Sequence, residues 1–213
     1  ELATPGDEDF SEDFFLRPSP GARNSVASDA VPPQIRQVRH EPRQPASDEG
    51  FVVTARVSDP EGVEQVEILF QVVRPGAYLP AFLPLSHPDL LRDARAPLRP
   101  NPDFDDPRSW SRRAMEPLEN GLDYRAVLPA LGNRVLFRYR IRVEDRKGNA
   151  ALVPYEDDPS LNFALYSWDG VPEYAATIQS VHPDGAGHVY PAEQMSALAT
   201  YTLITRDEDF TQA

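Results

Sequence analysis

The stretch "YRIRVEDRKGNAALVP" (139–154) decides the fold. Tyr139, Ile141 and Val143 alternate with arginines, which is the period of a β-strand with one buried face. The "DRKGN" segment then interrupts the alternation, and Gly148 can adopt the positive φ that a tight turn needs. Because "AALVP" is apolar again, we expect a strand, a turn and a return strand. Asp145 can stabilise that turn without binding a ligand.

The same alternation recurs along the chain. "FVVTARVSDP" (51–60) and "VEQVEILFQVV" (63–73) flank the turn tetrapeptide "DPEG", and they predict a second hairpin. Apolar positions expected on one face are Phe51, Val53, Ala55 and Val57 in the first run, and Val66, Ile68, Phe70 and Val72 in the second. With "VPPQIRQVRHEP" (31–42) as an edge strand, and with 121–129 and 161–170, about seven or eight strands lie between 34 and 168. This spacing predicts an all-β antiparallel sandwich.

Composition limits the other classes of protein. The 213 residues include 23 prolines, which disfavour long helices because proline removes a backbone donor. A formal net charge of −13 disfavours nucleic acid as a partner. No run approaches the roughly 18 apolar residues of a membrane span. The absence of cysteine from the sequence excludes disulfides and thiolate metal sites.

The chain divides into three parts. Residues 1–30 are expected to be an acidic linker or the end of a preceding domain, 31–170 the sandwich, and 171–213 a linker and the truncated start of another domain. The sandwich contains a proline-rich loop insertion at 74–111, and a long loop in a compact domain is often functional. Short helices are expected within 86–94 and 191–199, and a short strand is expected within 200–210.

Acidic turns are the main candidate sites. Asp59, Asp145, Asp157 and Asp158 lie in predicted loops and are candidate calcium ligands, because calcium takes six to eight oxygen ligands. The alternative is that they are ordinary solvated turn residues. The sequence contains no GxSxG or GxGxxG motif, so no catalytic residue and no cofactor other than calcium is predicted.

Aromatic and arginine side chains have two interpretations each. Loop aromatics could stack on sugar rings, or they could cap the core and hold the long loop down; they are Tyr78, Phe82, Phe104, Trp110, Tyr155, Tyr166, Trp168 and Tyr174. The stripe at 138, 140 and 142 could attract an acidic partner, or it could pair with acidic residues on neighbouring strands. Tyr139 is expected in the core, with its hydroxyl bonded to a neighbouring turn as in a tyrosine corner.

Several stretches resemble known families. "YRIRVEDRKGN" resembles the penultimate strand and closing turn of fibronectin type III and bacterial immunoglobulin-like domains, and residues 32–78 resemble the opening of the immunoglobulin-like module of large secreted bacterial proteins. "DPSLNFALYSWDGVPEY" (158–174) is similar to the segment that joins this module to a CotH-type (spore-coat kinase-like) domain. "MSALATYTLITRDEDF" (195–210) resembles the first strand of that domain, and "FFLRPSPGARN" (14–24) the exit of a lamin-tail domain.

The resemblance implies an order of lamin-tail, immunoglobulin-like and CotH-like domains in a secreted or cell-surface bacterial protein. We then expect a non-catalytic spacer or interaction module that positions its neighbours in the same chain and contacts a surface glycan or protein. One alternative is a calcium- or carbohydrate-binding adhesion module. A second is a fragment of a CotH-like kinase, whose nucleotide-binding lysine and metal-binding acids would lie beyond Ala213.

Overall fold

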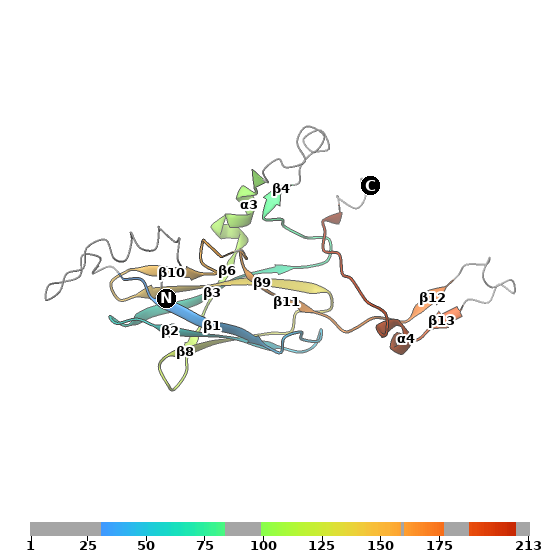
Figure 1. Cartoon of the computed structure of the whole chain (residues 1–213), viewed down its shortest axis with the longest axis horizontal. Coiled ribbons are helices and arrows are strands. Elements are labelled where there is room, and N and C mark those ends of the chain that lie inside the picture. Colours follow the sequence, from blue (N-terminus) through green and yellow to red (C-terminus); the bar gives the residue numbers. More distant parts are fainter. Residues whose placement is uncertain (1–30, 84–98, 159, 177–187, 208–213) are drawn as a thin grey trace, which may run out of the picture.

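The structure, a computed structural model, describes residues 31–83, 99–158, 160–176 and 188–207. Within these ranges the chain forms an all-β antiparallel sandwich of two main sheets, as the alternation predicts (Figure 1). The expected acidic linker at 1–30 and the expected helix within 86–94 lie outside the described residues. No helix among the described residues is long and apolar enough to cross a membrane.

The first sheet has the order β1-β2-β8-β7 and the second the order β10-β9-β3-β6, with β11 also paired to β9. The strands of the first sheet are β1 (Gln34–Glu41), β2 (Phe51–Ser58), β8 (Asp123–Leu128) and β7 (Glu116–Pro117). Those of the second are β10 (Ala150–Val153), β9 (Val135–Asp145), β3 (Val63–Val73), β6 (Ser111–Ala114) and β11 (Phe163–Ser167).

The strand order is that of an immunoglobulin-like sandwich. With β1, β2 and β3 as strands A, B and C, the first sheet reads A-B-E-D and the second places β9 as strand F beside C. The last strand is divided in two: β10 pairs with the end of β9 and β11 with its beginning. Both lie on the edge of β9 opposite β3, and the loop 154–162 joins them.

The core lies between the two sheets, where the alternating apolar faces meet. All four predicted residues of β2 are buried, and so are Val135, Phe137, Tyr139, Ile141 and Val143 of β9. Phe137 packs edge-on against Phe51 across the sandwich, with ring centroids 5.0 Å apart, and it stacks on Phe70 at 5.2 Å. Burial of these faces is the main stabilising term of the fold.

The end of β3 departs from the predicted alternation. Val72 is 41% exposed, whereas Gln71 and Val73 are buried. Gln71 is buried because the insertion covers the outer face of the second sheet, the face assigned to solvent. The side chain of Gln71 donates from Nε2 to the carbonyl of Phe104 at 3.5 Å.

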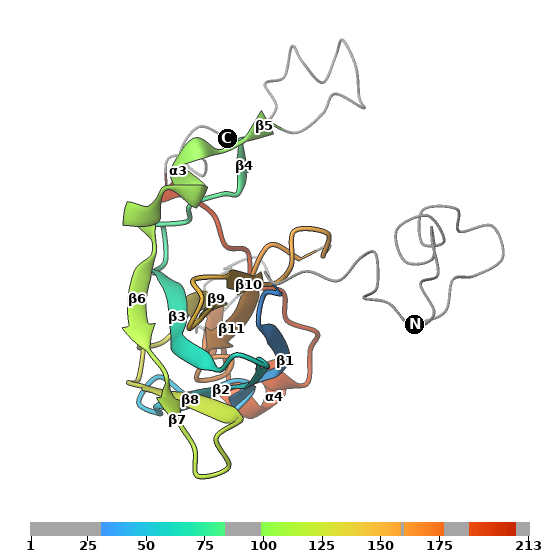
Figure 2. The ribbon, with the colours of Figure 1, turned by 90° about the vertical axis from the view of Figure 1, so that its left-hand side faces the viewer.

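The insertion folds back over the second sheet, on the side away from the first (Figures 1 and 2). Its described elements are β4 (Phe82–Leu83), β5 (Arg99–Pro100), α3 (Pro102–Asp105) and the 3-10 helix η1 (Pro107–Ser109). Phe104 and Trp110 are both buried and pack edge to face at 5.7 Å. For these two residues, the prediction that loop aromatics hold the insertion down is confirmed.

The arginine stripe is mostly covered by this insertion. Arg138 is 4% exposed and lies over the Phe104 ring at 4.8 Å, and Arg140 lies over the Trp110 ring at 4.5 Å. Within the described residues, Arg142 pairs with an acid on a neighbouring strand, Glu67 of β3, at 3.6 Å, whereas Arg140 pairs with Asp105 of α3 in the insertion at 3.1 Å. The prediction of strand-to-strand ion pairs is therefore wrong for Arg138 and Arg140, because the insertion supplies their partners: aromatic rings for both, and Asp105 for Arg140.

Tyr139 is 1% exposed, as predicted for a core residue, but its hydroxyl does not reach a turn. The hydroxyl forms a hydrogen bond of 2.9 Å with Nδ1 of His40 in β1. Burial raises the pKa of Tyr139. The tyrosine-corner expectation is wrong because Tyr139 lies in the middle of β9, opposite the first sheet.

The described tail contains β12 (Tyr174–Ala176) paired with β13 (His188–Tyr190), followed by α4 (Ala192–Ser196). The helix expected within 191–199 is therefore present. The strand expected within 200–210 is not formed at 201–205, where no neighbouring strand pairs with the backbone. Arg206 instead forms isolated bridges with Gly76 and Ala77.

The sandwich has two ends, a near pole and a far pole. At the near pole the chain enters β1 at Gln34, beside the β2–β3 and β9–β10 turns. At the far pole the chain leaves β11 at Ser167, opposite Val135 at the start of β9. Strand β9 has 11 residues, so the poles are about 35 Å apart.

Candidate metal centre

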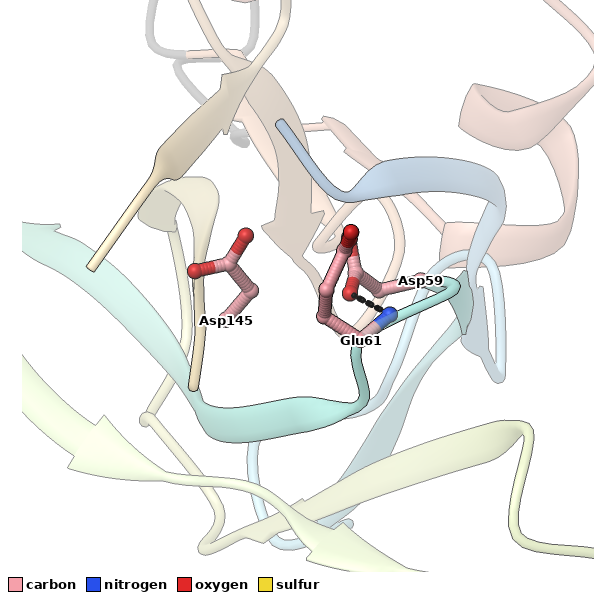
Figure 3. A group of neighbouring side chains, drawn as sticks. All are labelled: Asp59, Glu61 and Asp145. Carbon is pink, nitrogen blue, oxygen red and sulfur yellow. Dashed lines mark hydrogen bonds between the residues drawn. The ribbon is translucent and has the colours of Figure 1, made fainter. Parts of the chain in front are cut away.

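Three carboxylates from two turns meet at the near pole (Figure 3). Asp59 and Glu61 belong to the β2–β3 turn, and Asp145 is the last residue of β9. One carboxylate oxygen from each lies within 4.8 Å of the other two. Because β2 belongs to the first sheet and β9 to the second, the cluster spans both layers of the sandwich.

Local turn chemistry positions each of these side chains. Asp59 Oδ1 accepts the backbone N–H of Glu61 at 2.8 Å, which is the hydrogen bond of an Asx turn. Asp145 Oδ1 accepts the backbone N–H groups of Lys147 and Asn149, both at 2.8 Å. The same bonds that form the turns therefore fix the carboxylates.

Gly148 completes the β9–β10 turn. Its φ is +85°, as the sequence predicts, and its N–H donates to the carbonyl of Asp145 at 3.1 Å. A residue with a Cβ is disfavoured at this backbone conformation. The turn thus holds Asp145 facing the β2–β3 turn.

Two oxygens of the cluster are buried without a partner. Among the described residues, Asp59 Oδ2 and Glu61 Oε2 accept no hydrogen bond. Asp145 itself is 1% exposed. Burying charged oxygens without hydrogen bonds or a counter-ion is strongly unfavourable, and a bound cation would remove that penalty.

The charge of the cluster is only partly balanced. Lys147 Nζ lies 2.8 Å from Glu61 Oε1 and offsets one of the three carboxylates. The guanidinium of Arg146 lies near Gly62 in the same turn region. Asp59 and Asp145 have no ion pair with a described residue, so the field at the cluster stays negative.

The pKa of Asp145 favours the ionised form. Burial alone would raise this pKa, but hydrogen bonds from the Asn149 side chain and from the backbone N–H groups of Asn149, Lys147 and Gly148 outweigh burial and lower it. The carboxylate is therefore charged at neutral pH. A cation could bind Asp145 without displacing a proton.

An all-oxygen donor set selects the class of metal. Carboxylates suit hard cations such as Ca²⁺ and Mg²⁺ rather than zinc or copper, which favour nitrogen and sulfur ligands. Calcium accepts irregular geometry and can complete its shell with water and backbone carbonyls. The residues present fit a calcium ion with three protein carboxylates.

The structure brings together two of the four candidate ligands. Asp59 and Asp145 meet, whereas Asp157 and Asp158 are exposed in the loop 154–162 and do not belong to the cluster. Asp158 Oδ2 accepts the backbone N–H of Tyr155 at 2.8 Å, which is a turn role. Glu61 was missed, although it stands in the same "DPEG" tetrapeptide as Asp59.

Comparisons with known proteins add no family to this description. No protein-family model matches the chain, and a search of curated proteins finds no significant match. The class of protein is accordingly defined by the fold and the site: an all-β antiparallel sandwich with an acidic cluster that joins its two layers at one pole.

Proposed function

We propose that this chain is a non-catalytic spacer and interaction module whose near pole is stabilised by a bound calcium ion. The observation that carries the proposal is the pair of buried, unpartnered carboxylate oxygens of Asp59 and Glu61 beside the buried Asp145. Lys147 offsets the charge of Glu61, but Asp59 and Asp145 form no ion pair with a described residue and would repel one another without a further cation.

The mechanical part of the proposal follows from the two poles. Chain entry at Gln34 and exit at Ser167 lie at opposite ends of the sandwich, so neighbours on either side are kept about 35 Å apart. A cation shared by Asp59 and Asp145 ties the first sheet to the second where the chain enters. It would thereby restrict the movement of the preceding segment relative to the sandwich.

The setting of the proposal is a secreted or surface-attached bacterial protein. Extracellular modules bind calcium with dissociation constants of about 0.1–1 mM, which matches a site with only three protein carboxylates. The resemblance to lamin-tail and CotH-type flanks adds the neighbours that the module would position. Any kinase chemistry would belong to such a neighbour and not to this sandwich.

Thermal melting of the full chain tests the calcium site. With a dissociation constant of about 0.1 mM, 2 mM calcium would stabilise the folded state by about 1.8 kcal/mol. For a chain of this size that corresponds to a rise of about 4–7 °C in the melting midpoint relative to EDTA. Magnesium at the same concentration should give a smaller rise, because it demands a regular octahedral shell.

Matched variants assign the effect to the cluster. Asp59→Asn and Glu61→Gln should each reduce the calcium-dependent shift, whereas Asp157→Asn and Asp158→Asn remove the same charge at the exposed loop and should preserve it. Equal midpoints in calcium and EDTA for the unmodified chain would refute the site. The site would also be refuted if Asp157→Asn and Asp158→Asn reduced the calcium-dependent shift as much as Asp59→Asn and Glu61→Gln do.

A further inference from the structure

A cavity of about 620 Å³ opens at the far pole, between the sandwich and residues 200–207. Its walls come from the end of β3, the start of β9, the end of β11 and the C-terminal segment. None of the carboxylates of the near pole lines it. The cavity is therefore separate from the candidate metal centre.

Two arginines at this cavity have no anionic partner. Arg74 follows β3 and Arg134 precedes β9, and both side chains are exposed. Among the described residues, neither side chain forms an ion pair or a hydrogen bond. In a chain with 34 acidic and 21 basic residues, two unpaired arginines at one cavity mark a local excess of positive charge. Asp207 also lines the cavity, so the charged side chains of the lining, two arginines and one aspartate, sum to one positive charge.

Arg134 is held at the cavity by an unusual backbone. Its φ is +60°, in the left-handed region that non-glycine residues rarely adopt, and its N–H donates to the carbonyl of Ser167 at 2.8 Å. Such conformations concentrate at ligand sites, where the surrounding structure holds them in place. This hydrogen bond ties the backbone of Arg134 to Ser167 at the end of β11, the residue before Trp168.

Aromatic rings and hydroxyls form another part of the lining, beside aliphatic residues at 171–172 and 203–204. Tyr166, near the end of β11, and Trp168, just after it, are half-buried and line the cavity together with Thr200 and Thr202. Aromatic rings present an apolar face with a polar atom at the edge, and a pyranose can stack on such a face while its hydroxyls bond to polar neighbours. Guanidinium groups recognise carboxylates through paired N–H donors.

We propose that this cavity binds an acidic carbohydrate: a pyranose that carries a carboxylate, stacked on Trp168 or Tyr166 with its carboxylate at Arg134 and Arg74. The inference names a ligand class for the interaction role proposed above and rests on that role, but it does not require the calcium site. An acidic peptide would share only the charge complementarity. The aromatic and hydroxyl lining favours the sugar.

Isothermal titration of the full chain with a tetramer of galacturonic acid tests the proposal. The neutral control is a glucose tetramer of the same length, and the peptide control is tetraglutamate. All titrations are run in EDTA, so that calcium bridging cannot contribute. We expect binding of the galacturonate and at least about tenfold weaker binding of both controls, because each control lacks either the carboxylate or the ring.

Variants locate the binding site. Arg134→Gln and Trp168→Ala should each weaken galacturonate binding by about tenfold or more, whereas Arg112→Gln removes an exposed arginine from β6 and should leave binding within about twofold. A melting midpoint equal to that of the unmodified chain shows that a variant is folded. If Trp168→Ala does not fold, the binding result of Arg134→Gln alone tests the proposal.

The proposal is overturned if galacturonate does not bind at millimolar concentration, if either control binds equally well, or if Arg134→Gln binds like the unmodified chain. Because these titrations contain no calcium, such failure leaves the calcium-dependent melting result intact. A missing calcium shift would conversely leave the titration result intact.

Discussion

Phe104→Ala probes how the insertion is attached to the sandwich. The Phe104 ring is 1% exposed and lies under Arg138 at 4.8 Å and beside Trp110 at 5.7 Å. The backbone carbonyl of Phe104 accepts the indole N–H of Trp110 at 2.7 Å. That bond involves no side-chain atom of Phe104, so the substitution removes the ring while the local backbone contact can persist.

The size of the effect follows from burial. A buried phenylalanine ring removes about 150 Å² or more of apolar surface from water, and at about 25 cal/mol per Å² its loss amounts to about 4 kcal/mol. The usual range for Phe→Ala in a core is about 3–5 kcal/mol. The loss falls on the contact between insertion and second sheet, and not on the core between the sheets.

Hydrogen exchange followed by mass spectrometry measures this loss locally. We expect the amides of 99–110 to exchange much faster in Phe104→Ala, while those of β2 and β9 stay protected. Phe82→Ala is the control, because Phe82 lies in β4 of the same insertion but is 39% exposed. Equal protection of 99–110 in both variants would show that the ring does not anchor the insertion.

Three further predictions concern the sandwich itself. Ile141→Ala should lower the free energy of unfolding by about 2–5 kcal/mol in urea denaturation, because Ile141 is fully buried in β9; a loss below about 1 kcal/mol would contradict its core position. Gly148→Ala should cost about 1–2 kcal/mol through its φ of +85° alone, since a Cβ there meets no atom within 4 Å, and Gly148→Asn should cost less. Burial lowers the pKa of His40 below its ordinary value of 6.5, so the unfolded chain binds the proton more readily than the native state. The stability contributed by neutral His40 is present above pH 6.5 and is lost as the pH falls toward the native pKa. His40→Gln should therefore reduce the change in the urea unfolding midpoint between pH 7 and pH 5. An unchanged pH dependence of that midpoint would refute this.

The strands were predictable where the face toward the core is apolar at every second position. In β2 and β9 the apolar residues occur every second position, and the structure buries those faces. The end of β3 could not be predicted in this way, because burial of Gln71 depends on contacts from an insertion more than 30 residues further along. Alternation of apolar and polar residues predicts a strand with one buried face. The second sheet is instead covered by the first sheet on one face and by the insertion on the other.

The candidate site was partly predictable for a similar reason. Asp59 and Asp145 each stand in a recognisable turn, but their meeting depends on the register of β3 against β9, where Val63 pairs with Asp145. No sequence spacing encodes that register across more than 80 residues. Glu61 could have been found by treating all acidic residues of one turn as candidate ligands together.

The unpartnered buried atoms of the described residues belong to two kinds of group, a guanidinium and a pair of carboxylates. Arg138 Nε has no hydrogen-bond partner among the described residues, but the same guanidinium donates to Gln71 Oε1 at 2.6 Å and faces the rings of Phe104 and Tyr78. Those groups stabilise its positive charge. The unpartnered oxygens of Asp59 and Glu61 instead lie beside a third carboxylate, so their nearest charged neighbours include groups of the same sign. Hydrogen bonding and ring contacts account for the buried arginine. Lys147 pairs with one of the three carboxylates, and this incomplete balance is the reason for proposing a bound cation at the cluster.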